Sequence, residues 1–303
     1  MWILTTWALL SIQPYVATSQ GQLDWSIARD LAGKDTPNIL SELEFERVQS
    51  RELGVSASIA SEARGSWQLL LEGDGAYGWI DRGTTIDSDY FGDNRTGLYS
   101  RSRATITGDN GYALRGGGGI AYQLVPDRHI VQAIFGVYRQ VQTLNFQSGR
   151  QLVADATVYS GSELNAVNTQ LQHELDTHYR TEWQGNYLSL GYQWYLQKWS
   201  SAWRMNYLQG RYYGEGHWNL RDDFQQPRSF SHYVNSTGVE LLWTLNYEIG
   251  PQWNAYIGLM HQHWQSDTGV GVSYLADGSI NATRFNGVSW QVNQTRVGVS
   301  YRF

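Results

Sequence analysis

The chain of 303 residues is long enough for one or two soluble domains or for a single barrel. It contains no cysteine and only 17% charged residues, but it is rich in aromatic and small residues, with 14 Trp, 20 Tyr and 32 Gly. This composition suits a wall with one face in lipid and the other in water. The net charge of −6 argues against a nucleic-acid partner, which requires basic surfaces.

The amino terminus is an apolar run that ends in small residues at 16–19. We interpret residues 1–19 as a signal peptide cleaved near residue 19, without the usual basic start, and a short membrane anchor is the alternative. Residues 20–303 then form a single outer-membrane β-barrel domain. This part has no stretch of about 18 apolar residues that could span a bilayer as a helix. If it lies in a membrane, it must cross as a closed barrel.

Short turns and longer polar connections alternate along the rest of the chain. Short turns are expected at 61–66, 125–128, 196–199 and 249–252, and longer connections at 33–38, 84–110, 147–177, 219–229 and 276–287. They divide the chain into ten strands, with both termini on the side of the short turns. This pattern predicts an all-β fold, a ten-stranded antiparallel transmembrane β-barrel. Because the strands continue as polar sequence, we expect the barrel to extend above the outer membrane.

Several strands alternate with a period of two, as strands do when their two faces differ. Val239, Leu241, Trp243, Leu245 and Tyr247 form one apolar face. Glu240 and Glu248 lie on the opposite face, and we expect both to point into the lumen and to pair with Arg or Lys there. Together with Tyr195, Tyr256, Arg296 and Arg302, they are expected to fill a narrow lumen.

The carboxy-terminal strand reads "QTRVGVSYRF", in which apolar residues alternate with polar or small ones up to Phe303. We expect it to close the barrel against the first strand, near residues 23–28, and Phe303 to lie in an aromatic girdle. Arg47 and Arg51 share the parity of an apolar face that begins at Leu53, so they are expected above the lipid band or past a bulge. The glycines of "RGGGGIAY" (115–122) predict a close approach of neighbouring strands.

With ten strands assigned, the sequence resembles the omptin family of outer-membrane proteases over nearly the whole chain after residue 20. The resemblance lies in "LDWSIARDLAGK", in "SELEF" and in the "DSDYF" that ends the third strand. It implies a ten-stranded barrel with a catalytic cleft at its outer mouth and bound lipopolysaccharide. In omptins, two aspartates on one wall of the cleft face an Asp-x-His dyad on the opposite wall.

The resemblance assigns the aspartate pair to Asp87 and Asp89. On the opposite wall, "RYYGEGHWNLRDDF" places His217 at the aspartate position and Asn219 at the histidine position. An amide cannot take a proton from water, so proteolysis would require a shifted dyad of His217 with Asp222 or Asp223. Solvated rim charges or a calcium site are the other interpretations of the aspartate pair.

Three arginines near the outer rim, Arg95, Arg101 and Arg103, are candidates for binding lipopolysaccharide phosphates. His261 and His263 share a strand face and could form a metal pair or a polar surface pair. No cofactor is expected apart from lipopolysaccharide as a bound lipid, and no metal is assigned. The expected partners are outer-membrane lipid, lipopolysaccharide and the barrel-assembly machinery, with the chain as a monomer.

Three functions remain open on the sequence. The first, which the missing dyad favours, is a non-catalytic omptin-like barrel that is structural or binds at the cell surface. The second is an outer-membrane endopeptidase with a rearranged Asp/His site. The third is a small channel.

Overall fold

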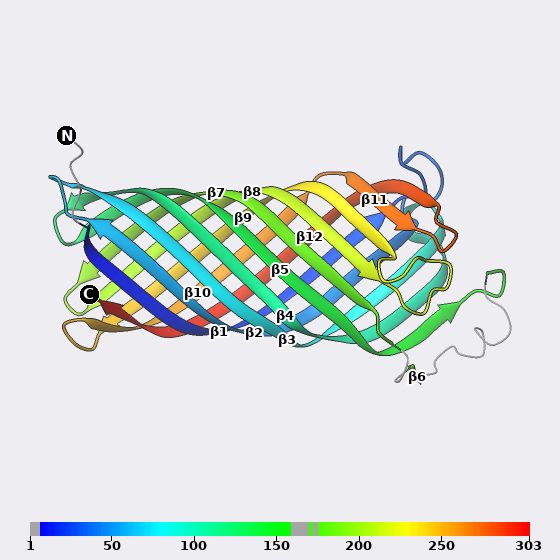
Figure 1. Ribbon diagram of the computed structural model, residues 1–303, viewed down its shortest axis with the longest axis horizontal. Helices are drawn as coiled ribbons and strands as arrows, with labels where there is room; N and C mark the ends of the chain where they lie inside the picture. Colours follow the sequence, from blue (N-terminus) through cyan, green and yellow to red (C-terminus); the bar gives the residue numbers. More distant parts are fainter. Residues whose placement is uncertain (1–6, 159–169, 172–174) are drawn as a thin grey trace.

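The computed structural model describes residues 7–158, 170–171 and 175–303, which form one closed wall of antiparallel strands (Figure 1). The long strands are β1 Trp7–Ile27, β2 Ser41–Ser61, β3 Trp67–Gly92, β4 Thr96–Val125, β5 His129–Ala154, β7 His178–Leu196, β8 Trp199–His217, β9 Phe230–Glu248, β10 Trp253–Ser266 and β12 Ile280–Arg302. Shorter elements are η1 Asp93–Arg95, β6 Gln170–Leu171 and β11 Gly269–Tyr274. No helix of the described segments is long and apolar enough to cross a membrane.

The ten long strands follow one another around the ring in chain order, and β12 returns to pair with β1. The closing register runs from Ser11↔Arg302 to Ile27↔Phe285, which confirms that the carboxy-terminal strand closes the barrel against the first strand. The predicted place was wrong, because residues 294–302 pair with residues 11–19, and residues 23–27 pair with the earlier part of β12. β11 pairs with the same two neighbours as β10, namely β9 and β12, and continues its direction. The two therefore form one position of the wall, interrupted at residues 267–268.

All four predicted short turns are confirmed, and they lie with both termini at one end of the barrel, the turn end (Figure 1). At the opposite, loop end, three predicted connections are longer than the observed ones. β3 and β4 continue through most of 84–110, leaving only η1 between them, and β12 already begins at Ile280. Similarly, β5 continues into the predicted loop 147–177, as far as Ala154. On these extensions the inner face mixes polar residues with core residues such as Ala104 and Ile106, so they lack the alternation that identifies a strand in lipid.

An apolar belt surrounds the half of the barrel near the turn end. Outward residues on neighbouring strands are well exposed, including Leu53 at 54%, Phe135 at 61%, Leu190 at 55% and Trp203 at 59%. Exposed apolar surface of this extent requires a covering phase, and the belt fits the lipid-facing band of an outer-membrane barrel. Trp243 belongs to this face and packs beside Trp203, with ring centroids 6.1 Å apart.

The irregular positions of the strands lie where the sequence predicted them. Arg47 has a φ of 51° within a register shift of β2 and β3, and Arg51 forms an outward ion pair with Asp81. The glycine run allows tight packing, because a Cβ on Gly117 would lie 2.5 Å from the Tyr187 hydroxyl and one on Gly119 would lie 2.0 Å from a backbone oxygen.

Residues 7–19, which we assigned to a signal peptide, form the first part of β1 and pair with both β2 and β12. Tyr15 and Ala17 are buried in the lumen. Cleavage near residue 19 would remove this half of β1 and leave two unpaired edges in lipid, which is costly. The signal peptide remains a prediction about export, and its boundary has to be measured on the protein.

The lumen has two layers. Towards the loop end it is filled by an aromatic core, in which Trp183 stacks on Trp264 at 5.1 Å and lies tilted against Tyr212, with ring centroids 4.5 Å apart. Towards the turn end it is polar and charged. There Glu240 is 2% exposed and receives both terminal nitrogens of Arg115, at 2.6 and 2.9 Å, which confirms the lumenal partner that we predicted.

The second predicted lumenal pair is not found. Glu248 has the inward parity of Glu240 but lies exposed at the turn end, where the described residues offer it no ion pair. Water solvates the Glu248 carboxylate at the rim, so it does not need a cationic partner to offset the cost of burial.

Candidate site at the outer mouth

Asp87 and Asp89 lie on the inner face of β3 where it leaves the lipid band. Two register shifts between Gly78 and Gly83 reset the parity of the strand, so that Thr85, 1% exposed, and the two aspartates point inward. Ser41 and Ser100 from the neighbouring strands hydrogen-bond Asp89. The pair therefore sits directly above the aromatic core, at the loop end of the lumen.

The surroundings of the pair favour its protonated form. Burial, with Asp89 close by, raises the pKa of Asp87 to about 8, and burial also raises the pKa of Asp89. Arg221 from the β8–β9 connection opposes this rise at both carboxyls, and the Trp218 side chain hydrogen-bonds Asp87. Near neutral pH the two groups therefore retain at least one proton.

His217 does not face this pair. The outward row of β8 contains Met205 and Tyr207, and a period of two places His217 on the same outer face. Its ring lies 4.9 Å from that of His178, its Nε2 is 3.9 Å from a carboxylate oxygen of Asp176, and its Nδ1 contacts the Pro227 carbonyl at 2.5 Å. The histidine thus joins β7 to the β8–β9 connection on the outside of the wall.

The remaining predicted residues of the second wall are also engaged elsewhere. The side-chain oxygen of Asn219 accepts hydrogen bonds from the backbone of Asp176 at 3.0 Å and from the Thr177 hydroxyl at 2.8 Å. Asp223 receives two nitrogens of Arg221 at 2.7 Å each, and Asp222 is exposed. The structure therefore does not bring His217 together with Asp222 or Asp223.

The residues that do face the aspartates, Trp218 and Arg221, were missed by the sequence reasoning. The signal for Trp218 was available, because extending the parity of Met205 and Tyr207 along β8 puts residue 217 outside and residue 218 inside. Trp218 packs on Phe230 at 4.7 Å and on Phe146 at 5.3 Å, so it extends the aromatic core up to the aspartates. Arg221 follows the strand in an irregular segment, where no periodicity predicts its direction.

The three rim arginines lie at the loop end. Arg95 donates to Glu42 at 2.7 Å, and Arg101 donates to Ser88 at 3.1 Å. Arg103 is exposed and lies opposite Arg150 in the β4–β5 register. Lipopolysaccharide binding by these residues remains a prediction.

The two β10 histidines are found on the outer surface. His261 contacts the Asn293 side chain at 2.8 Å, as a polar surface pair would. Within the described residues, no group of three or more His, Cys, Asp or Glu side chains is arranged to hold a metal ion. Neither the calcium interpretation of the aspartates nor a histidine metal pair gains support from this arrangement.

Comparison with known proteins gives a family and a fold. The family model described as "Pom: Protochlamydia outer membrane protein" matches residues 19–303. The crystal structure of the outer membrane protease OmpT from Escherichia coli matches with a TM-score of 0.73 and 13% identity, covering 98% of each chain. A FadL homologue from Pseudomonas aeruginosa reaches a TM-score of only 0.33 at 8% identity over 96% of this chain and 90% of that chain. No curated protein matches the sequence.

Proposed function

This chain belongs to the Protochlamydia outer membrane protein family and is a bacterial outer-membrane β-barrel with the omptin fold, and from that premise we propose that it is a non-proteolytic binding or structural protein of the cell surface. The observation that carries the proposal is the group opposite Asp87. Where hydrolysis needs a base that can take a proton from water, the inner face presents the indole of Trp218. An indole N–H can donate a hydrogen bond but cannot accept a proton.

The electrostatics of the mouth support the same proposal. A water nucleophile activated between two walls needs an ionised carboxylate or a neutral histidine with a free nitrogen facing the water. Here burial favours a protonated aspartate pair, and Arg221 is the positive charge that opposes this at both carboxyls. Without a base, the mouth is better suited to holding a ligand or a neighbouring surface than to cleaving a peptide.

The test is peptide cleavage by the folded barrel reconstituted with lipopolysaccharide. A library of dibasic and mixed peptides is offered to the wild type, to Asp87→Ala, Asp89→Ala and His217→Ala, and to Asp277→Ala as a loop control of equal charge change. We expect the same background rate in all five proteins. Turnover by the wild type and the control that disappears in Asp87→Ala or Asp89→Ala would refute the proposal. If turnover were also lost in His217→Ala, His217 would be identified as the base of the shifted dyad.

A small channel is the second candidate, because the lumen near the turn end is lined by polar and charged side chains around a cavity of about 270 Å³. The aromatic core closes this lumen towards the loop end. Single-channel recording tests the candidate: we expect no conductance from the wild type, whereas Trp264→Ala removes the stacking partner of Trp183 and should increase any leak. Wild-type openings of stable size would favour the channel.

A further inference from the structure

Three buried polar side chains form a hydrogen-bonded chain inside the aromatic core. The hydroxyls of Tyr212 and Tyr179 lie 2.7 Å apart, and the Tyr179 hydroxyl lies 2.9 Å from Nδ1 of His232. Tyr179 is 0% exposed, Tyr212 1% and His232 2%. A dissolved substrate therefore cannot contact these groups, and acid–base catalysis on a substrate does not explain them.

The protons of this chain can be assigned. Burial lowers the pKa of His232 to about 3, so the imidazole is neutral near neutral pH and has one accepting nitrogen. Burial also raises the pKa of Tyr179, so the phenol keeps its proton. With the imidazole proton on Nε2, Tyr212 donates to Tyr179, and Tyr179 donates to Nδ1 of His232. Tyr179 therefore has a proton acceptor within hydrogen-bond distance of its own hydroxyl.

Aromatic rings connect Tyr179 to the outer mouth. Trp218, whose side chain hydrogen-bonds Asp87, lies 4.7 Å from Phe230 between ring centroids. Phe230 lies 6.2 Å from Tyr179 and 5.8 Å from Trp25, and Trp25 lies 5.7 Å from Tyr179. Indole and phenol are the most easily oxidised aromatic rings of proteins. An electron can therefore leave the buried phenol for the mouth although a substrate cannot enter.

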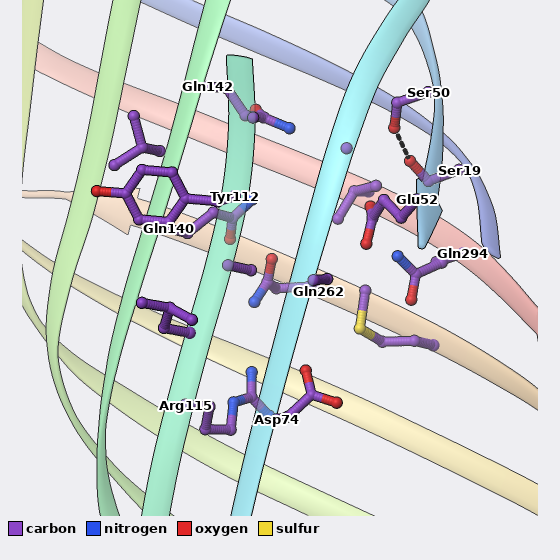
Figure 2. A pocket seen from close by; sticks show the side chains of 18 of the residues that line it. Ser19, Ser50, Glu52, Asp74, Tyr112, Arg115, Gln140, Gln142, Gln262 and Gln294 are labelled. Atoms are coloured by element: carbon purple, nitrogen blue, oxygen red, sulfur yellow. Dashed lines mark hydrogen bonds between the residues drawn. The ribbon is translucent and has the colours of Figure 1, made fainter. Parts of the chain in front are cut away.

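A second row of rings leads from the hydrogen-bonded chain towards the turn end. The ring of Tyr212 lies 4.5 Å from Trp183, which stacks on Trp264, and Trp264 lies 5.1 Å from Tyr138. Tyr138 borders the polar cavity in the middle of the lumen. Figure 2 shows the lining of this cavity, which includes Gln262. Oxidisable rings thus lie on both sides of Tyr179, towards the mouth and towards the polar lumen.

We propose that Tyr179 is a redox-active tyrosine, which gives one electron to a one-electron oxidant at the outer mouth while its hydroxyl proton moves to Nδ1 of His232. The O–H bond of Tyr179 breaks and an N–H bond forms on the imidazole. The products are a neutral tyrosyl radical, an imidazolium and the oxidant reduced by one electron. A one-electron reductant in the polar lumen, such as a thiolate that becomes a thiyl radical, then supplies an electron through the second row of rings, and the proton returns from His232.

The surroundings of His232 accommodate the imidazolium that this step creates. The ring of His232 is stacked on that of Phe285, with centroids 4.3 Å apart. A cation within about 6 Å of an aromatic face is attracted by the ring quadrupole. The radical cation of a phenol is also a far stronger acid than an imidazolium whose pKa is about 3, so the proton transfer is favourable. The proton moves only along one existing hydrogen bond.

The test is light-driven oxidation of the folded barrel from a fixed position at the mouth. Because the chain has no cysteine, Asp222→Cys allows a ruthenium photo-oxidant to be attached at one exposed site. Excitation with a sacrificial electron acceptor should produce a tyrosyl radical, detected by transient absorbance and electron paramagnetic resonance. Adding Tyr179→Phe should remove most of this signal. Adding Tyr213→Phe, which changes an outward tyrosine of β8, should leave the signal intact.

A tyrosyl signal that is absent, that is unchanged in Tyr179→Phe or that is lost in Tyr213→Phe would overturn the proposal. A second measurement needs no substitution in the core. The labelled barrel folded in D₂O should form the radical more slowly than the same protein in H₂O, because a proton moves with the electron. Equal rates in the two solvents, or a radical confined to tryptophan, would contradict the role of His232.

Discussion

The buried pair of Arg115 and Glu240 allows a quantitative prediction for Arg115→Met. The carboxylate of Glu240 is 2% exposed and receives two nitrogens of Arg115, together with the amides of Asn206 at 2.5 Å and Gln262 at 3.2 Å. Removing the guanidinium leaves a buried charge hydrogen-bonded by neutral amides, with Arg296 as the nearby cation. Such a loss costs about 3–5 kcal/mol, and the two remaining amides favour the lower end of this range.

The assay is urea unfolding of the barrel folded into phospholipid vesicles, followed by tryptophan fluorescence. Arg139→Met is the matched control, because Arg139 is 47% exposed and pairs with Glu182 on the outer face, where an ion pair contributes about 0–1 kcal/mol. The double variant Arg115→Met/Glu240→Leu should lose much less stability than Arg115→Met alone, since both charges are removed. If Arg115→Met costs no more than Arg139→Met, or the double variant costs the sum of its parts, the reasoning is refuted.

Three further predictions use the same unfolding assay or a folding gel. Trp243→Arg places a charge in the lipid-facing belt beside Trp203 and should cost about 2–4 kcal/mol near the midplane; a neutral effect would mean that this face is not in lipid. Because the pKa of Asp87 is raised above its unfolded value, its burial opposes folding increasingly as pH rises from about 4 to about 8. Asp87→Asn should therefore match the wild type near pH 4 and exceed it in stability at pH 8, and the opposite order would refute the assignment. Deleting Phe303, whose backbone N–H donates to Leu10 at 3.0 Å, should slow assembly into vesicles, and normal folding yields would contradict the girdle role.

The part of the fold that lies in lipid could be predicted from the sequence because apolar residues there face lipid and polar residues face the lumen. Val239, Leu241 and Tyr247 are exposed and Glu240 is buried, as their alternation indicated. Above the lipid band the outer face of a strand meets water and the inner face meets polar groups and the aromatic core, so the contrast between an apolar outer face and a polar inner face vanishes. Residues 84–92 and 96–110 were therefore interpreted as a loop although they pair throughout much of their length.

The candidate site was predicted only in part for a related reason. Asp87 and Asp89 are inside as expected, but only because register shifts near Gly78 and Gly83 reset the parity of β3. Bulges of this kind depend on both partner strands and leave little trace in one sequence. Ungapped pairing placed His217 in the mouth, whereas continuing the parity of β8 would have placed Trp218 there.

The pairing of β1 with β12 has a consequence for how the barrel folds. Every other pair of neighbouring long strands is consecutive along the chain, so these strands can pair as each hairpin is made. The closing seam instead joins residues as distant as Ser11 and Arg302, 291 positions apart. Contacts of such long range form slowly, because the chain must lose entropy before they contribute. The slowest intermediate is therefore an open sheet with two free edges, and closure is the step at which an assembly factor would accelerate folding most.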